Sequence, residues 1–307
     1  MGSSLNVSIW TTDEDRAARS AADVAREFDR LEALMSVWKP SSDVVRINAA
    51  AGTQPVTVHQ ETIDVLEQAG DASRRTHGKF DVTFGALAEL WKFDHDQDNV
   101  VPDRTAIEQR LPLVDHTAIE LHRANRTAFI TRPGVRVHLG GIGKGYAIDR
   151  AVTLLREAGF RDFLIQAGGD IFAAGTNNGP PWKLGIADPR GAHDAFAAVE
   201  VRDGTFSTSG DYERFFVKDG VRYHHLIDPD RGEPARGCRS VTIVATRAIV
   251  ADALSTGVFI MGPEAGMQLI EELPDVEGII VTAKNDVLIS SGLRGQVEIR
   301  GAPTDAP

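Results

Sequence analysis

The chain has 307 residues, of which 42% are hydrophobic and 25% are charged, so it can bury a substantial core as one large domain or two closely packed lobes. Its formal net charge of −11 and pI near 5.3 argue against a nucleic-acid or anionic-membrane partner, because no basic stretch offsets the acidic background. The single cysteine, Cys238, excludes an internal disulfide and a cysteine-rich metal site.

The sequence carries no signal for membrane insertion or export. No apolar run reaches the roughly 18 residues that suggest a membrane-spanning helix, so no transmembrane segment is predicted. Residues 1–7 lack the basic and apolar regions of a signal peptide. The compartment therefore stays open, and the protein would be cytoplasmic if the sequence is complete.

The N-terminal part of the chain is predicted to begin with a strand over residues 5–10. Thr11 and Glu14 have the spacing of a capping box, and the helix that follows places apolar residues on one face. These residues are Val24, Phe28, Leu31 and Met35. Residues 35–48 lose this pattern around a proline and are predicted to be a structured loop, and a second helix is predicted over 60–76.

Short strands and helices alternate irregularly through the rest of the chain. The predicted strands are 119–121, 128–130, 135–139 and 163–167, with further short strands to about residue 244 and a closing hairpin of 278–282 and 287–290. The predicted helices are 146–158, one near Ala251 and 263–273. Residues 301–307 are expected to be a frayed tail. Because regular strand–helix–strand units are few, the mixture favours an α+β fold over a doubly wound sheet.

The segment 251–257 combines one carboxylate with two hydroxyl side chains. If it is helical, Asp252, Ser255 and Thr256 stand at positions i, i+3 and i+4 and share one face. Hard oxygen ligands of this kind suit Mg²⁺, which takes few protein oxygens and completes its shell with phosphate and water. The alternative is that Asp252 caps the helix and that the two hydroxyl residues only pack.

A glycine-rich run from His138 to Tyr146 joins a predicted strand to a predicted helix. Its glycines let the backbone approach a ligand, and a helix N-terminus favours anionic oxygen. Gly143-Lys144 is followed by Gly145 rather than by Ser or Thr, so the run is not a Walker A loop, and it contains no G-x-G-x-x-G motif. A tight turn and a phosphate site both remain open.

Three further features each allow a structural and a functional interpretation. His225 is either a hydrogen-bonded structural histidine or a group for proton transfer. Trp38 either closes the edge of the core or stacks on an aromatic ligand. Phe80 and Asp81 either begin a strand or contribute to a binding site.

Taken together and in order, a series of motifs resembles the FAD:protein FMN transferases, the ApbE-type flavin transferase family. These motifs cover nearly the whole chain, and their shared order is far more specific than any one of them. They are Met1-Gly2-Ser3, Met35-Ser36-Val37-Trp38-Lys39-Pro40-Ser41-Ser42-Asp43, Gly78-Lys79-Phe80-Asp81-Val82-Thr83, the glycine-rich run, Ala167-Gly168-Gly169-Asp170, Thr208-Ser209-Gly210-Asp211-Tyr212, His225-Leu226-Ile227-Asp228-Pro229 and the segment 251–257.

The resemblance implies a single domain over residues 1–307, with FAD in a cleft between two lobes built from mixed or antiparallel sheets and flanking helices. It implies an enzyme that uses Mg²⁺ to cleave the pyrophosphate of FAD, attaches FMN through a phosphoester to a Ser or Thr of another protein, and releases AMP. Two alternatives stay open, an FAD pyrophosphatase that transfers to water and a non-catalytic FAD-binding protein.

By matching position, the resemblance assigns roles to individual residues. The cofactor-binding residues are Met1, Trp38, Lys79, Phe80, Asp81, His138, Lys144 and Leu226, with Trp38 stacking on the isoalloxazine ring. The metal-binding residues are Asp252, Thr256, Ser255 and, through its carbonyl, Gly141. His225 and Asp252 are the catalytic residues, with His225 as base for the acceptor hydroxyl, a task that suits the usual histidine pKa of about 6.5.

The expected partner is a separate redox or respiratory protein. The acceptor motif of the family is Ser/Thr-Gly-Ala-Ser/Thr, and the chain itself contains no such motif. His138 is a departure, because many family members have Asp at this position. The resemblance also favours the cell envelope, although neither a signal peptide nor a lipobox cysteine is visible.

Overall fold

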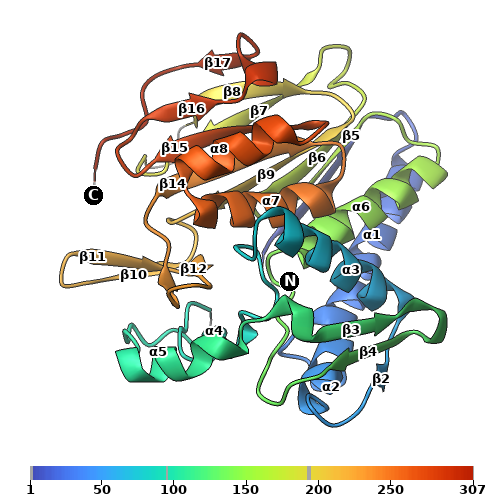
Figure 1. Ribbon diagram of the computed structural model, residues 1–307. Helices are drawn as coiled ribbons and strands as arrows, with labels where there is room; N and C mark the ends of the chain where they lie inside the picture. The colour runs from blue at the N-terminus through green and yellow to red at the C-terminus, as the bar shows by residue number, and fades with distance from the viewer. Residues whose placement is uncertain (1–2, 95, 192–194, 307) are drawn as a thin grey trace.

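The computed structural model describes residues 3–94, 96–191 and 195–306 (Figure 1). Its centre is a seven-stranded antiparallel sheet of order β1-β5-β6-β9-β14-β15-β16. The strands are β1 (Leu5–Ile9), β5 (Phe163–Ala167), β6 (Asp170–Ala174), β9 (Gly204–Gly210), β14 (Cys238–Ala245), β15 (Val276–Thr282) and β16 (Val287–Ile289). With the helices around it, this sheet confirms the predicted α+β fold.

Three helices, α6 (Gly143–Glu157), α7 (Ala248–Met261) and α8 (Pro263–Glu272), cover one face of the main sheet. The other helices in the described ranges are α1 (Glu14–Met35), α2 (Asp43–Ala49), α3 (Gln60–Arg75), α4 (Gly85–Ala88) and α5 (Arg104–Arg110). α7 packs on β9 and β14, α8 packs on β15, and α6 packs against α7, β5 and β6 (Figure 1). None of the described helices is long and apolar enough to cross a membrane.

Smaller antiparallel units complete the fold. One sheet has the order β17 (Val297–Ile299), β8 (Ala195–Val201), β7 (Trp182–Ala187), and another has the order β2 (Val56–Thr57), β4 (Thr127–Ile130), β3 (Ile119–His122). Two hairpins are β10 (Phe215–Lys218) with β11 (Val221–His224) and β12 (Ile227–Asp228) with β13 (Glu233–Pro234). Side chains of β7 and β8 join the main sheet in one hydrophobic cluster, on the face away from α7.

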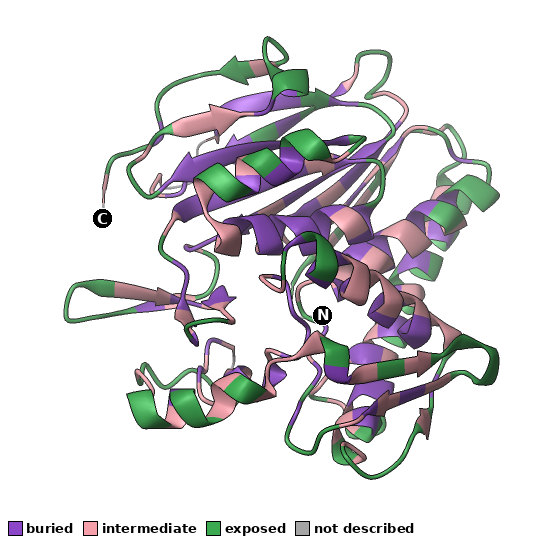
Figure 2. Cartoon of the chain, in the orientation of Figure 1, coloured by how far each residue is buried: buried purple, intermediate pink, exposed green. Residues whose placement is uncertain are grey.

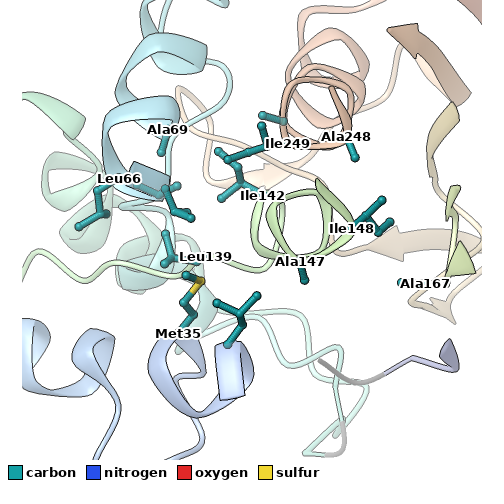
Figure 3. Close-up of a cluster of buried hydrophobic side chains, with 14 of the residues drawn as sticks. Met35, Leu66, Ala69, Leu139, Ile142, Ala147, Ile148, Ala167, Ala248 and Ile249 are labelled. Carbon is teal, nitrogen blue, oxygen red and sulfur yellow. The ribbon is translucent and has the colours of Figure 1, made fainter. Parts of the chain in front are cut away.

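The largest hydrophobic cluster joins the helices to the sheet. It combines Met35 of α1, Leu66 of α3, Ile148 of α6, Ala167 of β5 and Ile249 of α7 (Figure 3). Figure 2 shows that burial is concentrated in the main sheet and in α7. Because α7 is composed largely of small and apolar residues, it can be buried on nearly all sides. Two polar residues of this helix, Asp252 and Ser255, are therefore placed in the protein interior.

The N-terminus of α7 is capped by a side chain from α6. The residue before α7, Arg247, makes no side-chain capping bond of its own. Instead, the backbone N–H groups of Ala248 and Ile249 donate to the two carboxylate oxygens of Asp149, at 2.7 and 3.2 Å. The helices cross closely at this point, since a Cβ atom on Gly145 would lie 2.4 Å from the carbonyl oxygen of Ala248. Asp149 thus fixes the start of α7 relative to α6.

We expect Asp149→Ala to lower the free energy of unfolding by about 1–2 kcal/mol, because two N–H groups lose their cap and a negative charge leaves the helix N-terminus. Asp149→Asn, which keeps one acceptor oxygen, should lose less. Urea unfolding followed by circular dichroism measures both variants. An unchanged midpoint for Asp149→Ala would show that the cap does not stabilise the fold.

Near the N-terminus the structure corrects two predictions. The strand over 5–10 is confirmed as β1, but the cap of α1 is Asp13 rather than Thr11, because Asp13 accepts the bond from the backbone N–H of Arg16. Residues 35–48 are not entirely a loop. α2 begins at Asp43, and the hydroxyl of Ser42 caps it by accepting a bond from the N–H of Val45 at 3.0 Å.

Residues 135–139 form no strand, although their sequence alternates like one. The N–H of Val137 donates to the side chain of Asn48, and the N–H of His138 donates to the carbonyl of Val82. A side chain and a loop thus occupy the positions where a neighbouring strand would pair. The following helix, predicted from residue 146, begins already at Gly143. The glycine-rich run therefore lies partly inside the first turn of α6.

The C-terminal segment, predicted to fray, is held to the protein over its described part. The backbone N–H and hydroxyl of Thr304 both donate to the carboxylate of Asp188. Arg239 donates to the carbonyl of Thr304 and pairs with Asp305, and Asn285 donates to the carbonyl of Pro303. These partners are distant in sequence, so no local pattern could predict them.

Candidate active site

Asp252 lies on α7 at the contact with α6 and is 3% exposed. Its Oδ2 accepts a hydrogen bond from the backbone N–H of Gly145 at 2.8 Å. Its Oδ1 lies 3.5 Å from the ammonium nitrogen of Lys144. The first turn of α6 therefore contacts the carboxylate with both a backbone donor and a positive side chain. Asp252 does not cap its own helix, since it lies one turn inside α7.

Lys144 pairs more closely with a second buried carboxylate. Its Nζ lies 2.8 Å from Oδ2 of Asp170, which is 3% exposed at the start of β6. The other oxygen of Asp170 accepts a hydrogen bond from the hydroxyl of Ser207 on β9. Asp170 belongs to one of the motifs that the sequence pointed out, but no role had been assigned to it. The sequence did contain a signal for Asp170, because this carboxylate directly follows two glycines at the end of a predicted strand.

The two hydroxyl residues of α7 face β9. Ser255 donates to the carbonyl of Asp252 at 2.9 Å and lies 2.9 Å from the hydroxyl of Ser209. The Thr256 Oγ1 lies 3.3 Å from the same Ser209 hydroxyl. A Cβ atom on Gly141 would lie 3.5 Å from Oγ1 of Thr256, so the glycine-rich run passes directly beside this residue. Metal binding by these groups remains a prediction.

The charges of this cluster act on one another. Burial and the nearby charge of Asp170 raise the pKa of Asp252 to about 6, although Lys144 opposes the change. For Lys144, burial lowers the pKa, but the two carboxylates outweigh burial and raise it above its usual value. Lys144 is therefore positively charged at neutral pH. A carboxylate with a raised pKa in a buried cluster is typical of functional sites.

His225 is partly exposed and lies between β11 and β12. Its Nδ1 lies 3.3 Å from the carbonyl oxygen of Arg214. Because a carbonyl oxygen only accepts, the proton of a neutral ring must be on Nδ1, which leaves Nε2 with a free lone pair. Burial and the positive charge of Arg214 lower the pKa of His225 well below 6.5, and Lys144 contributes to the same effect. The ring is neutral at neutral pH.

The neighbouring His224 is a buried histidine whose contacts indicate a role in the fold. It is 2% exposed, its Nε2 donates to the carbonyl oxygen of Ala235 at 2.8 Å, and its ring packs edge-on against Phe259. Its Nδ1 accepts a bond from the N–H of Leu226. Both ring nitrogens of His224 are thus occupied, whereas His225 uses only one in the described contacts.

We expect His224 to make the fold acid-sensitive. Burial lowers its pKa to about 4, with the bond to Ala235 opposing the shift. As pH falls below the unfolded value of about 6.5, the unfolded chain takes up a proton that the folded chain does not, so stability falls until about pH 4. The loss from this group is about 3 kcal/mol. Because glutamine does not titrate there, the unfolding free energy of His224→Gln should depend less steeply on pH. Equal slopes in urea titrations between these two pH values would contradict this assignment.

Ion pairs join the segment 79–81 to residues 228–230, which follow His225 in the chain. The ammonium of Lys79 lies 2.7 Å from Asp228, the last residue of β12, and 2.8 Å from Asp230 in the turn that follows. The backbone N–H groups of Lys79 and Phe80 both donate to Thr76. A ligand contact from this backbone is therefore expected to use carbonyl groups.

Phe80 and Asp81 differ in what they contact. Phe80 is buried beside the glycine-rich run, since a Cβ atom on Gly141 would lie 3.3 Å from its ring. The carboxylate of Asp81 is occupied by the backbone N–H groups of Thr83, at 2.7 Å, and His116, at 2.9 Å. The Asp81 side chain therefore stabilises the loop. If Asp81 contacts the cofactor, we expect it to do so through its backbone.

The remaining predicted cofactor residues lie in different environments. Trp38 is 54% exposed, as an aromatic platform for a ligand would be, and Leu226, which follows His225, is buried in a hydrophobic cluster. His138 accepts a bond from the N–H of Gly140 and lies beside the ring of Phe84, and burial lowers its pKa to about 4. His138 is thus a neutral ring at neutral pH, which cannot supply the negative charge of an aspartate. Met1 lies outside the described residues.

The donor chemistry of the centre fits a hard divalent cation. No three His, Cys, Asp or Glu side chains gather in a metal-binding group anywhere in the described ranges. The predicted set differs from such a group, because it combines one carboxylate with hydroxyls and a carbonyl. Oxygen donors of this kind suit Mg²⁺. Asp170 adds a second buried carboxylate, whose Oδ2 lies 2.8 Å from the ammonium nitrogen of Lys144.

The fold and this buried polar centre define the class of protein to which the chain belongs. The sequence model of the ApbE family matches residues 1–280. The chain is 35% identical over 287 residues to the FAD:protein FMN transferase of Treponema pallidum (strain Nichols), covering 88% of this chain and 79% of that protein. It is 32% identical over 308 residues to an FAD:protein FMN transferase of Klebsiella pneumoniae (strain 342), covering 100% of this chain and 93% of that protein.

Solved structures agree with this assignment. The ApbE protein of Thermotoga maritima matches with a TM-score of 0.89 and 34% identity, over 96% of each chain. The flavin transferase ApbE of Vibrio cholerae matches with a TM-score of 0.84 and 27% identity, over 96% of each chain. The chain therefore belongs to the ApbE family, an enzyme family, and the resemblance drawn from the ordered motifs is confirmed.

Proposed function

We propose that the chain is a Mg²⁺-dependent FAD:protein FMN transferase. It cleaves the diphosphate of FAD, attaches FMN by a phosphoester bond to a Ser or Thr of an acceptor protein, and releases AMP. The names of the relatives support the transferase class. The observation that carries the proposal is the buried Asp252, which lies beside hydroxyl groups and the glycine-rich run. Its neighbour Lys144 is close enough to His225 to contribute to the lowered pKa of that ring.

His225 is the residue that we assign to proton transfer. A Ser or Thr hydroxyl is a poor nucleophile near neutral pH, so a positioned base helps. The Nε2 lone pair of His225 would accept the hydroxyl proton as the hydroxyl oxygen bonds to the flavin-side phosphorus. The bond from that phosphorus to the bridging oxygen breaks, and AMP leaves with the bridging oxygen and its electron pair. Since Nδ1–H donates to the Arg214 carbonyl, the ring is already in the required tautomer.

Asp252, Thr256, Ser255 and the carbonyl of Gly141 would hold Mg²⁺. When bound, the cation would neutralise negative charge on the phosphoryl oxygens. Lys144 adds a positive charge beside the same position. These local charges also explain how an acidic chain with a net charge of −11 could attract a diphosphate. Trp38 would stack on the flavin ring through its exposed indole.

The acceptor is proposed to be a separate redox or respiratory protein with a Ser/Thr-Gly-Ala-Ser/Thr motif. AMP released from FAD and Mg²⁺ should be measured with and without such a protein. A transferase should release AMP in step with acceptor labelling and slowly without acceptor. Fast release of AMP and FMN without acceptor would instead identify an FAD pyrophosphatase, and binding of FAD without release would identify a carrier.

A further inference from the structure

Two buried carboxylates in the centre share one ammonium group. Asp170 and Asp252 are each 3% exposed, and Lys144 contacts both of them. The serines linked to this cluster are neutral: Ser207 bonds to Asp170 and to Ser255, and Ser255 bonds to Ser209. The buried centre therefore carries one uncompensated negative charge. Isolated charge is costly in the protein interior, so the site favours the entry of a cation.

Lys144 lies closer to one of the two carboxylates than to the other. Its ammonium lies 2.8 Å from Asp170 but 3.5 Å from Asp252. The hydroxyl of Ser207 bonds to Oδ1 of Asp170, whereas the ammonium of Lys144 lies against Oδ2. On Asp252, Oδ2 is occupied by the N–H of Gly145, and the contact of Oδ1 among the described residues is the longer one with Lys144. Oδ1 is thus the carboxylate oxygen most available to another cation.

We propose that Asp170 is a positioning residue that holds Lys144 away from Asp252, so that a divalent cation can bind Asp252 while Lys144 remains beside it. This inference rests on the proposed Mg²⁺ site. Without Asp170, the ammonium is free to pair directly with Asp252 and to compete with the cation. The role of Asp170 is thus electrostatic and acts through Lys144, and Asp170 itself need not touch metal or FAD.

The proposal predicts opposite changes in cation affinity for substitutions of Asp170 and of Lys144. Asp170→Asn leaves the buried centre neutral, and cation affinity should fall by about tenfold or more. Lys144→Met leaves two negative charges and removes the competing ammonium, so cation affinity should rise by about tenfold or more. The double variant has the same net charge as the wild type, so its affinity should return to within about threefold of the wild-type value. A purely structural role predicts instead that both single variants bind more weakly.

The test is the dissociation constant of Mn²⁺, measured on the full chain without FAD by electron paramagnetic resonance at one fixed pH above neutrality. Ser207→Ala is the matched control, because it removes the hydroxyl that bonds to Asp170 and changes no charge. Its affinity should stay within about threefold of the wild type. Circular dichroism checks that each variant is folded.

Several outcomes would overturn the inference. Unchanged or tighter binding by Asp170→Asn would do so, and so would weaker binding by folded Lys144→Met. If a single variant does not fold, the double variant decides, because its buried centre has the same net charge as that of the wild type, and a loss beyond tenfold there would contradict the proposal. Absence of Mn²⁺ binding by the wild type would contradict the proposed metal site itself, which separates the two failures.

Discussion

Asp252→Ala is expected to reduce FAD cleavage by a factor of about 10³ or more, a loss typical of removing a group that directly stabilises charge in a reaction. Asp252 is the only carboxylate in the predicted metal-binding set, and its Oδ1 is the oxygen that remains most available. The initial rate of AMP release from FAD and Mg²⁺ measures the effect. The variant should remain folded, because the substitution also removes repulsion with Asp170.

Asp252→Asn provides the control for this prediction. The amide keeps the size of the side chain and can still accept the bond from the N–H of Gly145, but it has no negative charge. If charge is what matters, the two variants should lose activity to a similar extent. Normal FAD turnover by either folded variant would remove Asp252 from the metal site.

His225→Ala is expected to slow FMN transfer to protein by about 10²–10⁴-fold, the usual contribution of a general base. FAD affinity should change little, since the proposed role of the ring is proton transfer. Because the pKa of His225 lies well below 6.5, the wild-type rate should show no titration of this ring near pH 6.5. Acceptor labelling under single-turnover conditions, at matched pH, measures the effect.

His224 offers a matched control within the same segment. The two histidines are adjacent, but both nitrogens of His224 are occupied by Ala235 and Leu226. His224→Gln should therefore retain transfer at neutral pH, whereas His225→Ala should not. Full transfer by His225→Ala would remove the base assignment, and equal losses in the two variants would point to a structural effect of the whole segment.

Local sequence patterns were sufficient for much of the fold. The apolar face of α1 and the alternation in β1 depend on neighbouring residues, and both were predicted. α2 was missed because its short helix follows a proline and begins with a Ser42 cap inside a polar stretch. Residues 135–139 were misassigned because strand formation needs a pairing partner, and the partner here is the side chain of Asn48. Neither fact is visible in local periodicity.

In the site, too, local patterns were predictable from the sequence and long-range contacts were not. Spacing on one helix correctly predicted that Asp252, Ser255 and Thr256 share a face, and motif order placed Gly141 with them. The contact between Lys144 and Asp170 depends on how α6 lies against β6, which the sequence does not state. The tautomer of His225 likewise depends on a carbonyl in another strand region. Long-range contacts of this kind needed the structure.

The most direct test of the central claim is the intact mass of an acceptor protein that carries an Asp-x-x-Ser-Gly-Ala-Thr segment, after incubation with the chain, FAD and Mg²⁺. We predict that the acceptor gains the mass of one FMN group, and that EDTA or Asp252→Ala prevents this gain. An acceptor of unchanged mass, whether FAD is hydrolysed to AMP and FMN or only bound, would contradict the assignment of this chain as a flavin transferase.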